Sequence, residues 1–296
     1  MVRASARRRL RSLLASVALV PAVLTVAACG ATVTDSGATA QRGDLPAAIQ
    51  QSGVLRNGAD FTYPPLEYVE KDGKTFTGVD YELAEGIGEK LGVEVQHSNA
   101  AFGSLIPMLQ SRRVDMVLSF ATVTDERKEA VDFIEYSQSG TAMMVKKGNP
   151  EGIETIDDLC GKAVGLQSGA VQVPIAEAAS ERCVAAGKPA IDIKQLAKDS
   201  EVQLLLRAGR IAADLLDSPV AAYSAAQGDD FEVIPNERYE VRPHGVMVLK
   251  GNEQLATAIQ KALQEMVADG SYTAILEKYD VADIALDEIT ISRAGD

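Results

Sequence analysis

Three short segments of this 296-residue chain combine a chemically active side chain with the end of a predicted strand and the start of a predicted helix. In residues 122–127 (TVTDER), Thr124 is expected to be a helix N-cap, which puts Arg127 in the first helical turn. A cation there opposes the helix dipole by about 0.5 kcal/mol, so it requires a compensating partner. Arg127 therefore forms either a surface ion pair, which the residue types alone favour, or a bidentate grip on a carboxylate ligand.

The other two segments end in small residues and in an acid. Residues 167–170 (QSGA) precede a helix predicted from about Ala170, whose free N–H groups suit a carboxylate; an ordinary capped helix start fits them too. Asp217 ends the run IAADLL, with Ser218 expected as the cap and Pro219 as the first helical residue. In open α/β sheets this position faces the ligand crevice, where a carboxylate suits an ammonium group; the alternative is a second cap.

The elements that position these segments begin at Gly53, where short apolar runs start to alternate with amphipathic stretches. This alternation predicts an α/β protein with mainly parallel strands. Apolar residues recur every four positions over 79–91, and Gly92 follows as a C-cap, which predicts one helix. Later helices are expected at 255–266, ended by Gly270, and at 272–279, and strands at 114–119 (VDMVLS), 163–166 (AVGL) and 211–216 (IAADLL).

The composition excludes several classes of function. Apolar residues make up 46% and charged residues 24%, an ordinary globular balance for one large domain or two small ones. The net charge of −13 would repel a nucleic-acid backbone, and no GxxxxGK[ST] nucleotide loop is present. Three cysteines and two histidines, without C-x-x-C or H-E-x-x-H, supply no metal site. His97 and His244 are expected to be packing or surface residues, and no cofactor is expected.

The N-terminus has the pattern of an export signal. Residues 1–11 contain five arginines and no acid, and the apolar stretch 13–28 is too short to cross a bilayer. Its end, VAACG, resembles a bacterial lipobox, which implies cleavage before Cys29, acylation of its sulfur and anchoring at the outer face of the cell membrane. The alternative is a plain signal peptide. Removing residues 1–28 leaves 24 basic and 42 acidic residues, a charge of −18, and residues 29–48 are expected to form a flexible linker.

Export also changes the interpretation of the remaining cysteines. Cys160 and Cys183 are 23 positions apart, and outside the cytoplasm they are expected to form a disulfide. Closing such a loop adds about 3 kcal/mol by the chain-entropy estimate. The alternative is two free, buried thiols.

From about residue 55 to 279, the chain resembles the polar amino-acid solute-binding proteins of ABC importers, bacterial extracellular solute-binding protein family 3. Each matching motif is weak alone, but their order and spacing together are specific. The motifs are 60–68 (DFTYPPLEY), 78–84 (GVDYELA), 105–110 (LIPMLQ), 124–127 (TDER) with 131–133 (VDF), 161–169 (GKAVGLQSG) and 217–221 (DSPVA).

The resemblance implies the type 2 periplasmic-binding fold, in which two α/β lobes are joined by two hinge strands and hold one ligand between them. The hinge strands are expected near 137–141 and 239–244. The implied division is 49–139 plus 243–285 for lobe 1, 140–242 for lobe 2 and 286–296 for a C-terminal tail.

The resemblance also implies roles for eleven residues. Arg127 and Thr122 would grip the α-carboxylate of the ligand from lobe 1, and the backbone of Ser168, Gly169 and Ala170 would do so from lobe 2. Asp217 and the carbonyl of Phe120 would hold the α-ammonium, and Asp60, Tyr63, Phe102 and Gln167 would surround the side chain. Two positions depart from the family pattern: Ala170 stands where threonine is usual, and Phe120 where glycine or serine is common.

These assignments imply a monomeric, non-enzymatic binding protein that delivers a free amino acid to permease subunits with a cytoplasmic ATPase, all on other chains. A cationic ligand is favoured, because aromatic faces and Asp60 both attract a distal cation. Glutamine follows closely and an acidic ligand ranks last. The alternative functions are an enzyme on the same scaffold, resembling cyclohexadienyl dehydratase, and a ligand-sensing domain.

Overall fold

The computed structural model describes residues 40–296, except for the side chains of residues 236–238. The predicted signal peptide, the lipidation of Cys29 and the first part of the linker lie outside the described residues. Within the described part of the chain, no helix is both long enough and apolar enough to cross a bilayer.

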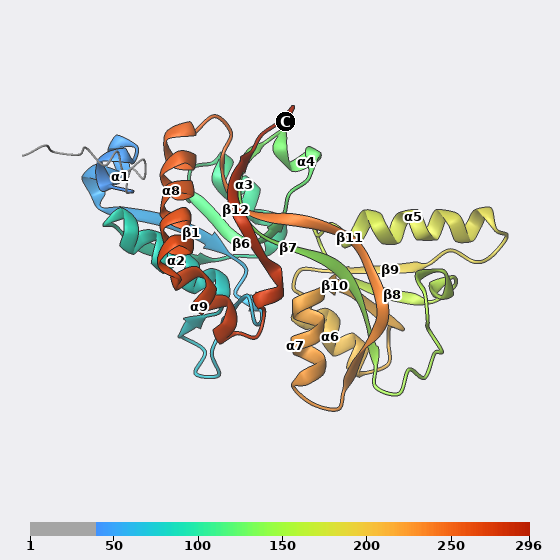
Figure 1. The fold of residues 1–296 in the computed structure, drawn as a ribbon. Coiled ribbons are helices and arrows are strands. Elements are labelled where there is room, and N and C mark those ends of the chain that lie inside the picture. Colours follow the sequence, from blue (N-terminus) through green and yellow to red (C-terminus); the bar gives the residue numbers. More distant parts are fainter. Residues whose placement is uncertain (1–39) are drawn as a thin grey trace, which may run out of the picture. The chain divides into compact units, whose positions relative to one another are not determined.

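One nine-stranded sheet runs through the described residues (Figure 1). Strands pair in parallel at both of its ends, as predicted, whereas the strands in the middle are antiparallel. The order is β5 (Glu94–Asn99), β1 (Val54–Ala59), β6 (Met116–Thr122), β11 (Phe231–Leu249), β7 (Val131–Lys146), β10 (Ala213–Asp217), β8 (Ala163–Gln167) and β9 (Asp192–Leu196), and β12 (Ala285–Ser292) also pairs with β7. A small second sheet consists of β2 (Thr62–Tyr63), β3 (Glu67–Val69) and β4 (Phe76–Thr77).

The two long central strands join the two halves of the sheet. β7 and β11 pair in antiparallel fashion from Val131 opposite Leu249 to Lys146 opposite Phe231, and the ribbon shows both strands crossing from one half to the other (Figure 1). Both predicted hinge segments, 137–141 and 239–244, fall inside these strands. The pairing register shifts between Tyr239 and Arg242, within the second predicted segment.

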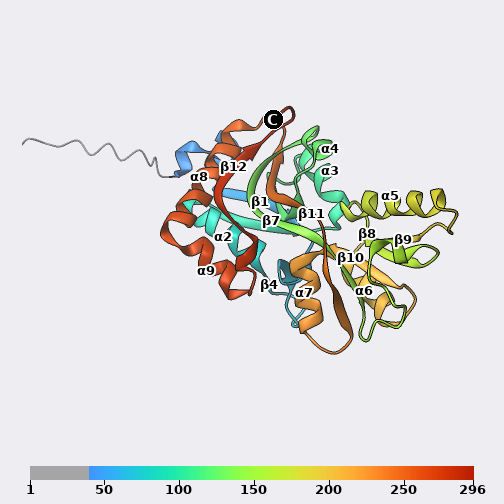
Figure 2. The same ribbon diagram turned by 45° about the vertical axis from the view of Figure 1, so that its right-hand side comes forward.

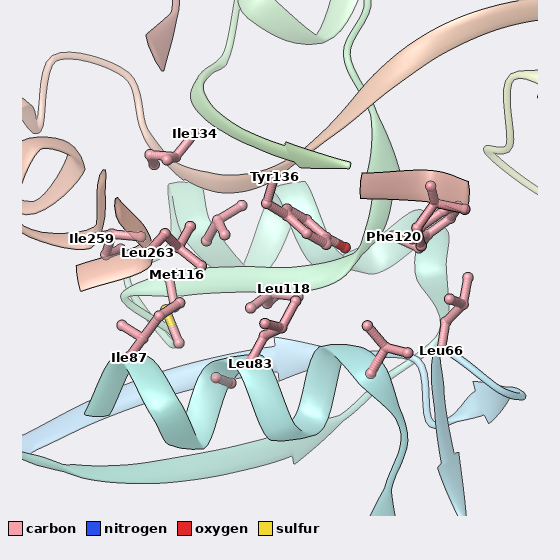
Figure 3. Packing of buried hydrophobic residues seen from close by; sticks show 14 of the residues in the cluster. Leu66, Leu83, Ile87, Met116, Leu118, Phe120, Ile134, Tyr136, Ile259 and Leu263 are labelled. Atoms are coloured by element: carbon pink, nitrogen blue, oxygen red, sulfur yellow. The ribbon is translucent and has the colours of Figure 1, made fainter. Parts of the chain in front are cut away.

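The helix predicted over 79–91 is confirmed as α2 (Val79–Leu91), ended by Gly92 in the left-handed conformation. Its buried face, which includes Leu83 and Ile87, packs against β6 and α8 (Glu253–Asp269), as the clustered side chains show (Figure 3). Because the residues that recur every four positions fall on one helical face, this pattern specified the helix correctly.

The remaining helices cover the two halves of the sheet separately. Figure 2 shows α6 and α7 beside β10 in one half, and α8 and α9 beside β12 in the other. The helices other than α2 and α8 are η1 (Arg42–Asp44), α1 (Ala47–Ser52), η2 (Phe102–Ser104), α3 (Leu105–Gln110), α4 (Asp125–Lys128), η3 (Ile156–Leu159), α5 (Gln172–Ala185), α6 (Asp199–Arg207), α7 (Ser218–Ala226), α9 (Ser271–Lys278) and η4 (Ala282–Ile284).

The predicted disulfide between Cys160 and Cys183 is confirmed, with the two Cα atoms 5.5 Å apart. It ties the residue after η3 to the last turn of α5. Cys183 is buried in the apolar cluster of this half, together with Leu159 and Val164.

The structure differs from the expectation at both edges of the folded body. Residues up to 48 were expected to be a flexible linker, yet Leu45 is fully buried in the main apolar cluster and η1 precedes it. Residues 286–296 were expected to be a tail, yet most of them belong to β12, whose Ile289 is buried. In both segments one or two apolar side chains among polar ones are enough to dock the backbone.

Candidate ligand-binding site

One cavity lies where the two halves of the sheet face each other. Its wall contains nine of the eleven predicted site residues, whereas Ser168 and Gly169 do not line it. A water-sized sphere can occupy only about 20 Å³ of it, roughly the room for one water. The lining residues are Asp60, Tyr63, Glu67, Phe102, Ser119, Phe120, Thr122, Arg127, Gln167, Ala170, Val171, Gln172 and Asp217.

Direct hydrogen bonds across the cavity explain why it is small. The amide Nε2 of Gln167 donates to Oδ2 of Asp60 at 2.9 Å, and the hydroxyl of Tyr63 donates to Oδ2 of Asp217 at 2.8 Å. Both bonds cross the cavity: Gln167 and Asp217 end β8 and β10, whereas Asp60 follows β1 and Tyr63 belongs to the small second sheet. A ligand that enters between these groups must take over the hydrogen bonds that they make to each other.

Asp217 is placed by the end of β10, one residue before α7. The structure corrects the predicted cap: Asp217, not Ser218, occupies the N-cap position, and no capping hydrogen bond from its side chain is present in the described residues. Instead, its carboxylate accepts hydrogen bonds from the hydroxyl of Tyr63 and, at 3.2 Å, from Nε2 of Gln172. The carboxylate is therefore available to the cavity and not committed to the helix.

Arg127 is placed by α4, which is a single turn, and its predicted cap is confirmed because Oγ1 of Thr124 accepts the Arg127 N–H at 3.1 Å. The guanidinium donates to the carbonyl of Thr122 at 2.7 Å and to that of Gly169 at 2.9 Å, and it lies 5.2 Å from the ring centre of Phe102. Among residues 40–296 it has no ion-pair partner, so the surface pair that residue types alone favoured does not form. Burial lowers the pKa of Arg127 to about 10, which still leaves it charged at neutral pH.

The backbone of residues 168–170 differs from the expected anion site. Helix α5 begins at Gln172, two residues later than predicted. The N–H of Ser168 donates to the carbonyl of Leu196 at 2.8 Å, and the N–H of Ala170 donates to that of Gln167 at 3.2 Å. These two groups are therefore engaged within the protein, and the segment meets the cavity mainly through Ala170.

Asp60 contacts both the neighbouring loops and the cavity. Its carboxylate accepts the hydroxyl of Thr62 at 2.7 Å and the N–H of Phe102 at 3.1 Å, which fixes the neighbouring loops. It also accepts the amide of Gln167 and lines the cavity. Burial raises its pKa, an effect that these hydrogen bonds partly offset.

Sequence reasoning missed a pair of buried carboxyl groups next to the cavity. Glu67 lines the wall and accepts the hydroxyl of Ser119 at 2.7 Å, while the carboxylate of Asp80 accepts the hydroxyl of Tyr136 at 2.7 Å and the N–H of Phe120 at 2.6 Å. Burial raises the pKa of Glu67 well above its usual range and that of Asp80 to about 7. Both lie in motifs quoted above, but their spacing of 13 residues gave no sign of proximity.

Val171, Gln172 and His244 were also missed. Gln172 is the first residue of α5, and His244, expected to be a packing or surface residue, is buried beside Asp217. No three His, Cys, Asp or Glu side chains within residues 40–296 gather as a metal-binding group.

Two curated relatives are similar over most of their length. The L-cystine-binding protein TcyJ of Escherichia coli (strain K12) is 34% identical over 237 residues, which cover 80% of this chain and 86% of the relative. The arginine-binding extracellular protein ArtP of Bacillus subtilis (strain 168) is 32% identical over 265 residues, which cover 88% and 95%.

Solved structures show the same fold. An ancestral arginine-binding protein bound to arginine has a TM-score of 0.70 at 36% identity, with 77% of this chain and 98% of that chain covered. The ancestral amino acid-binding protein AncCDT-1, a precursor of cyclohexadienyl dehydratase, has a TM-score of 0.68 at 32% identity, with 78% and 97% covered. The type 2 periplasmic-binding fold is thus confirmed.

The family model for bacterial extracellular solute-binding proteins, family 3, matches residues 55–282. This match spans both halves of the sheet and all eleven predicted ligand-binding residues. The chain therefore belongs to the bacterial extracellular solute-binding proteins, family 3.

Proposed function

We propose that this protein is the substrate-binding component of an amino-acid ABC importer, which closes on a free polar amino acid outside the cytoplasm. One observation carries the proposal: the guanidinium of Arg127 and the carboxylate of Asp217 line the same cavity. These are the two charges that an α-carboxylate and an α-ammonium require. The names of the relatives TcyJ and ArtP, which refer to cystine and arginine, support the same class of ligand.

Binding requires the two lobes, 49–139 plus 243–285 and 140–242, to separate and close again about β7 and β11. The direct contact between Tyr63 and Asp217 yields to the ligand ammonium, which the Phe120 carbonyl also accepts. Arg127 and Thr122 take the carboxylate from lobe 1, opposite the backbone at 168–170.

The charges on the wall favour a ligand with a distal cation. Asp60 lies in the wall with the amide of Gln167 and attracts a guanidinium or ammonium group. The aromatic contribution is smaller than the sequence indicated, because the cation of Arg127 already lies over Phe102 and His244 already stacks on Phe120. Arginine, lysine and ornithine rank first, glutamine second and glutamate last.

Calorimetric titration with L-arginine, L-lysine, L-ornithine, L-cystine, L-glutamine and L-glutamate tests the proposal. In a thermal-shift assay, a ligand at 100 times its Kd stabilises the protein by about 2.7 kcal/mol. Asp60→Asn is the matched variant: it should weaken arginine binding more than glutamine binding. Tightest binding of glutamate would contradict the ligand class, and binding of none of the six would contradict the function.

The proposed partners are a membrane permease and its cytoplasmic ATPase. The binding protein is a monomer in this proposal, and lipid on Cys29 anchors it to the membrane. Metabolic labelling with palmitate tests the anchor: Cys29→Ser should abolish labelling and release the protein from membranes. Retention of the variant on membranes would show that another segment holds it.

The enzyme alternative has one supporting observation, the likeness to AncCDT-1, which is itself described as an amino acid-binding protein. Incubation with prephenate or arogenate separates the two functions. A binding protein returns the compound unchanged, whereas an enzyme releases its decarboxylated, dehydrated product. A sensing role would instead appear as lost signalling with uptake intact.

A further inference from the structure

His244 lies between the two side chains that would hold the α-carboxylate and the α-ammonium of the ligand, Thr122 and Asp217. It belongs to β11 and is 1% exposed. Its Nε2 atom is 3.2 Å from Oγ1 of Thr122 and 3.5 Å from Oδ1 of Asp217. Thr122 comes from one half of the sheet and Asp217 from the other, so one imidazole nitrogen faces both halves.

The ring of His244 is held in place by its neighbours. It stacks on Phe120 with the ring centres 4.0 Å apart and the planes 21° apart. In the sheet His244 pairs directly with Thr122 on β6 and with Ser137 on β7, which puts these side chains on one face. The ring therefore has little freedom to turn away from Asp217.

The hydrogen-bond pattern leaves one ring nitrogen open. Within residues 40–296, Nδ1 of His244 and Oγ of Ser137 are both buried without a hydrogen-bond partner. When the proton of the neutral imidazole is on Nε2, this N–H has Oγ1 of Thr122 as its hydrogen-bond partner at 3.2 Å and faces the Asp217 carboxylate at 3.5 Å, while Nδ1 stays a free acceptor. A second proton on Nδ1 makes a cation next to that carboxylate.

The charged and titratable groups around this nitrogen are few. β10 contributes Asp217, β2 contributes the Tyr63 hydroxyl that donates to it, and α4 contributes the guanidinium of Arg127. β6 faces His244 with Phe120 and Thr122, and β7 with Ser137, none of which titrates near neutral pH. Asp199 acts on Asp217 electrostatically from α6.

We propose that His244 is a positioning residue for the ammonium-binding carboxylate of Asp217, and that a proton on His244 competes with the ligand ammonium for it. This inference rests on the proposed function. Neutral His244 presents only the dipole of its Nε2–H to Asp217 from 3.5 Å, whereas protonated His244 puts a positive charge where the ligand brings its own. Amino-acid binding is therefore strongest when His244 is neutral, weakens as the pH falls, and expels a proton from the imidazole.

The expected size follows from linkage. Competition with one proton weakens binding by at most tenfold per pH unit. We therefore expect binding of L-arginine to be about tenfold weaker at pH 5.5 than at pH 7.5, and no more than about a hundredfold weaker. Other buried acids also titrate in this window, so the comparison between variants carries the test.

Calorimetry with L-arginine at pH 7.5 and 5.5, in buffers of different ionisation enthalpy, measures both affinity and proton release. His244→Gln keeps an N–H donor without a titratable ring. Its Kd for L-arginine at pH 7.5 should lie within about threefold of the wild-type value, and most of the tenfold ratio between the Kd at pH 5.5 and the Kd at pH 7.5 should be lost. His244→Phe keeps the stacked ring without the donor and should bind more weakly at both pH values. His97→Gln, on β5, is the matched control and should keep the wild-type ratio.

A second measurement needs no ligand. The chain has only two histidines, so the imidazole NMR signals are assigned with the single variants. Asp217→Asn should make His244 take up its proton at a lower pH, and L-arginine should do the same in wild type. An unchanged midpoint with Asp217→Asn, or a wild-type ratio in His244→Gln, would overturn the inference. Absence of amino-acid binding at either pH would instead overturn the proposed function, and the inference with it.

Discussion

Replacement of Arg127 is the most direct test of the carboxylate grip. In the structure the Arg127 guanidinium donates two hydrogen bonds, at 2.7 and 2.9 Å, to backbone carbonyls of opposite halves of the sheet. In the complex we expect the same fork to hold the ligand carboxylate. Arg127→Ala removes the only cation among the residues that line the cavity and leaves the carboxylate charge unpaired.

The magnitude follows from the number and type of bonds lost. Hydrogen bonds to charged groups contribute about 1.5–3 kcal/mol each, and truncation of a buried charge pair costs about 2–5 kcal/mol. Arg127→Ala removes two hydrogen bonds to the ligand carboxylate, one of them partly exposed. The expected loss of binding free energy is therefore about 3–5 kcal/mol, which is roughly two to four orders of magnitude in Kd. Arg127→Lys keeps the charge without the planar fork and should lie between Arg127→Ala and wild type.

Calorimetric titration of the preferred amino acid measures the loss, with circular dichroism to establish that each variant is folded. Arg207→Ala is the matched control. That guanidinium also lies over a phenylalanine ring, 5.3 Å from the centre of Phe231, and pairs with Asp230 at 2.8 Å, but it does not line the cavity. Its Kd should stay within twofold of wild type. Binding by folded Arg127→Ala within threefold of wild type would refute the carboxylate grip.

Three further predictions concern stability. Replacing Cys160 and Cys183 by serine should lower the free energy of unfolding by about 3 kcal/mol in urea titrations, and no loss would contradict the loop-entropy argument. Burial raises the pKa of Asp199 to about 7, so its contribution to the free energy of unfolding is full below about pH 4 and is lost as the pH rises through 7. Asp199→Asn should flatten this dependence of the unfolding free energy on pH, and an unchanged dependence would assign it to another group. Gly78→Ala should cost about 2–3 kcal/mol in thermal unfolding, because the φ of Gly78 is +116° and the new Cβ would clash with the carbonyl oxygen of Leu66. Gly92→Ala, where the new Cβ meets open space, should cost about 1 kcal/mol, and equal losses would contradict the steric reason.

Local patterns predicted the regular elements well where periodicity and a terminator agreed. α2 begins at Val79 and ends at Gly92 because an apolar stripe and a left-handed glycine specify the same limits. The strand at 114–119 was placed too early: β6 runs from Met116 to Thr122. Thr122 is held in register by β11, a strand more than a hundred residues away that no local pattern contains, and Phe120 lies where this pairing becomes irregular.

The candidate site was predicted largely from strand ends and family motifs, since parallel strands bring their carboxyl ends to one edge of a sheet. Glu67, Asp80 and His244 were missed for a common reason. Each acquires hydrogen-bond partners only when distant segments come together, as in the contacts of Asp80 with the Phe120 N–H, 40 residues away, and of His244 with Thr122, 122 residues away.

The sequence by itself determined the α/β class and the helix α2 with its glycine end, because these depend on short-range periodicity and backbone conformation. The cysteine pairing followed from the export signal, and most residues of the cavity wall followed from the resemblance to the family. Only the tertiary structure decided that Arg127 faces the cavity without an ion-pair partner among the described residues, that Asp217 binds Tyr63 instead of capping α7, and that His244 lies next to Asp217. The physical reason is that a side chain chooses its partner by distance and desolvation. Both are set by the long strands β7 and β11, which bring the two halves of the sheet together.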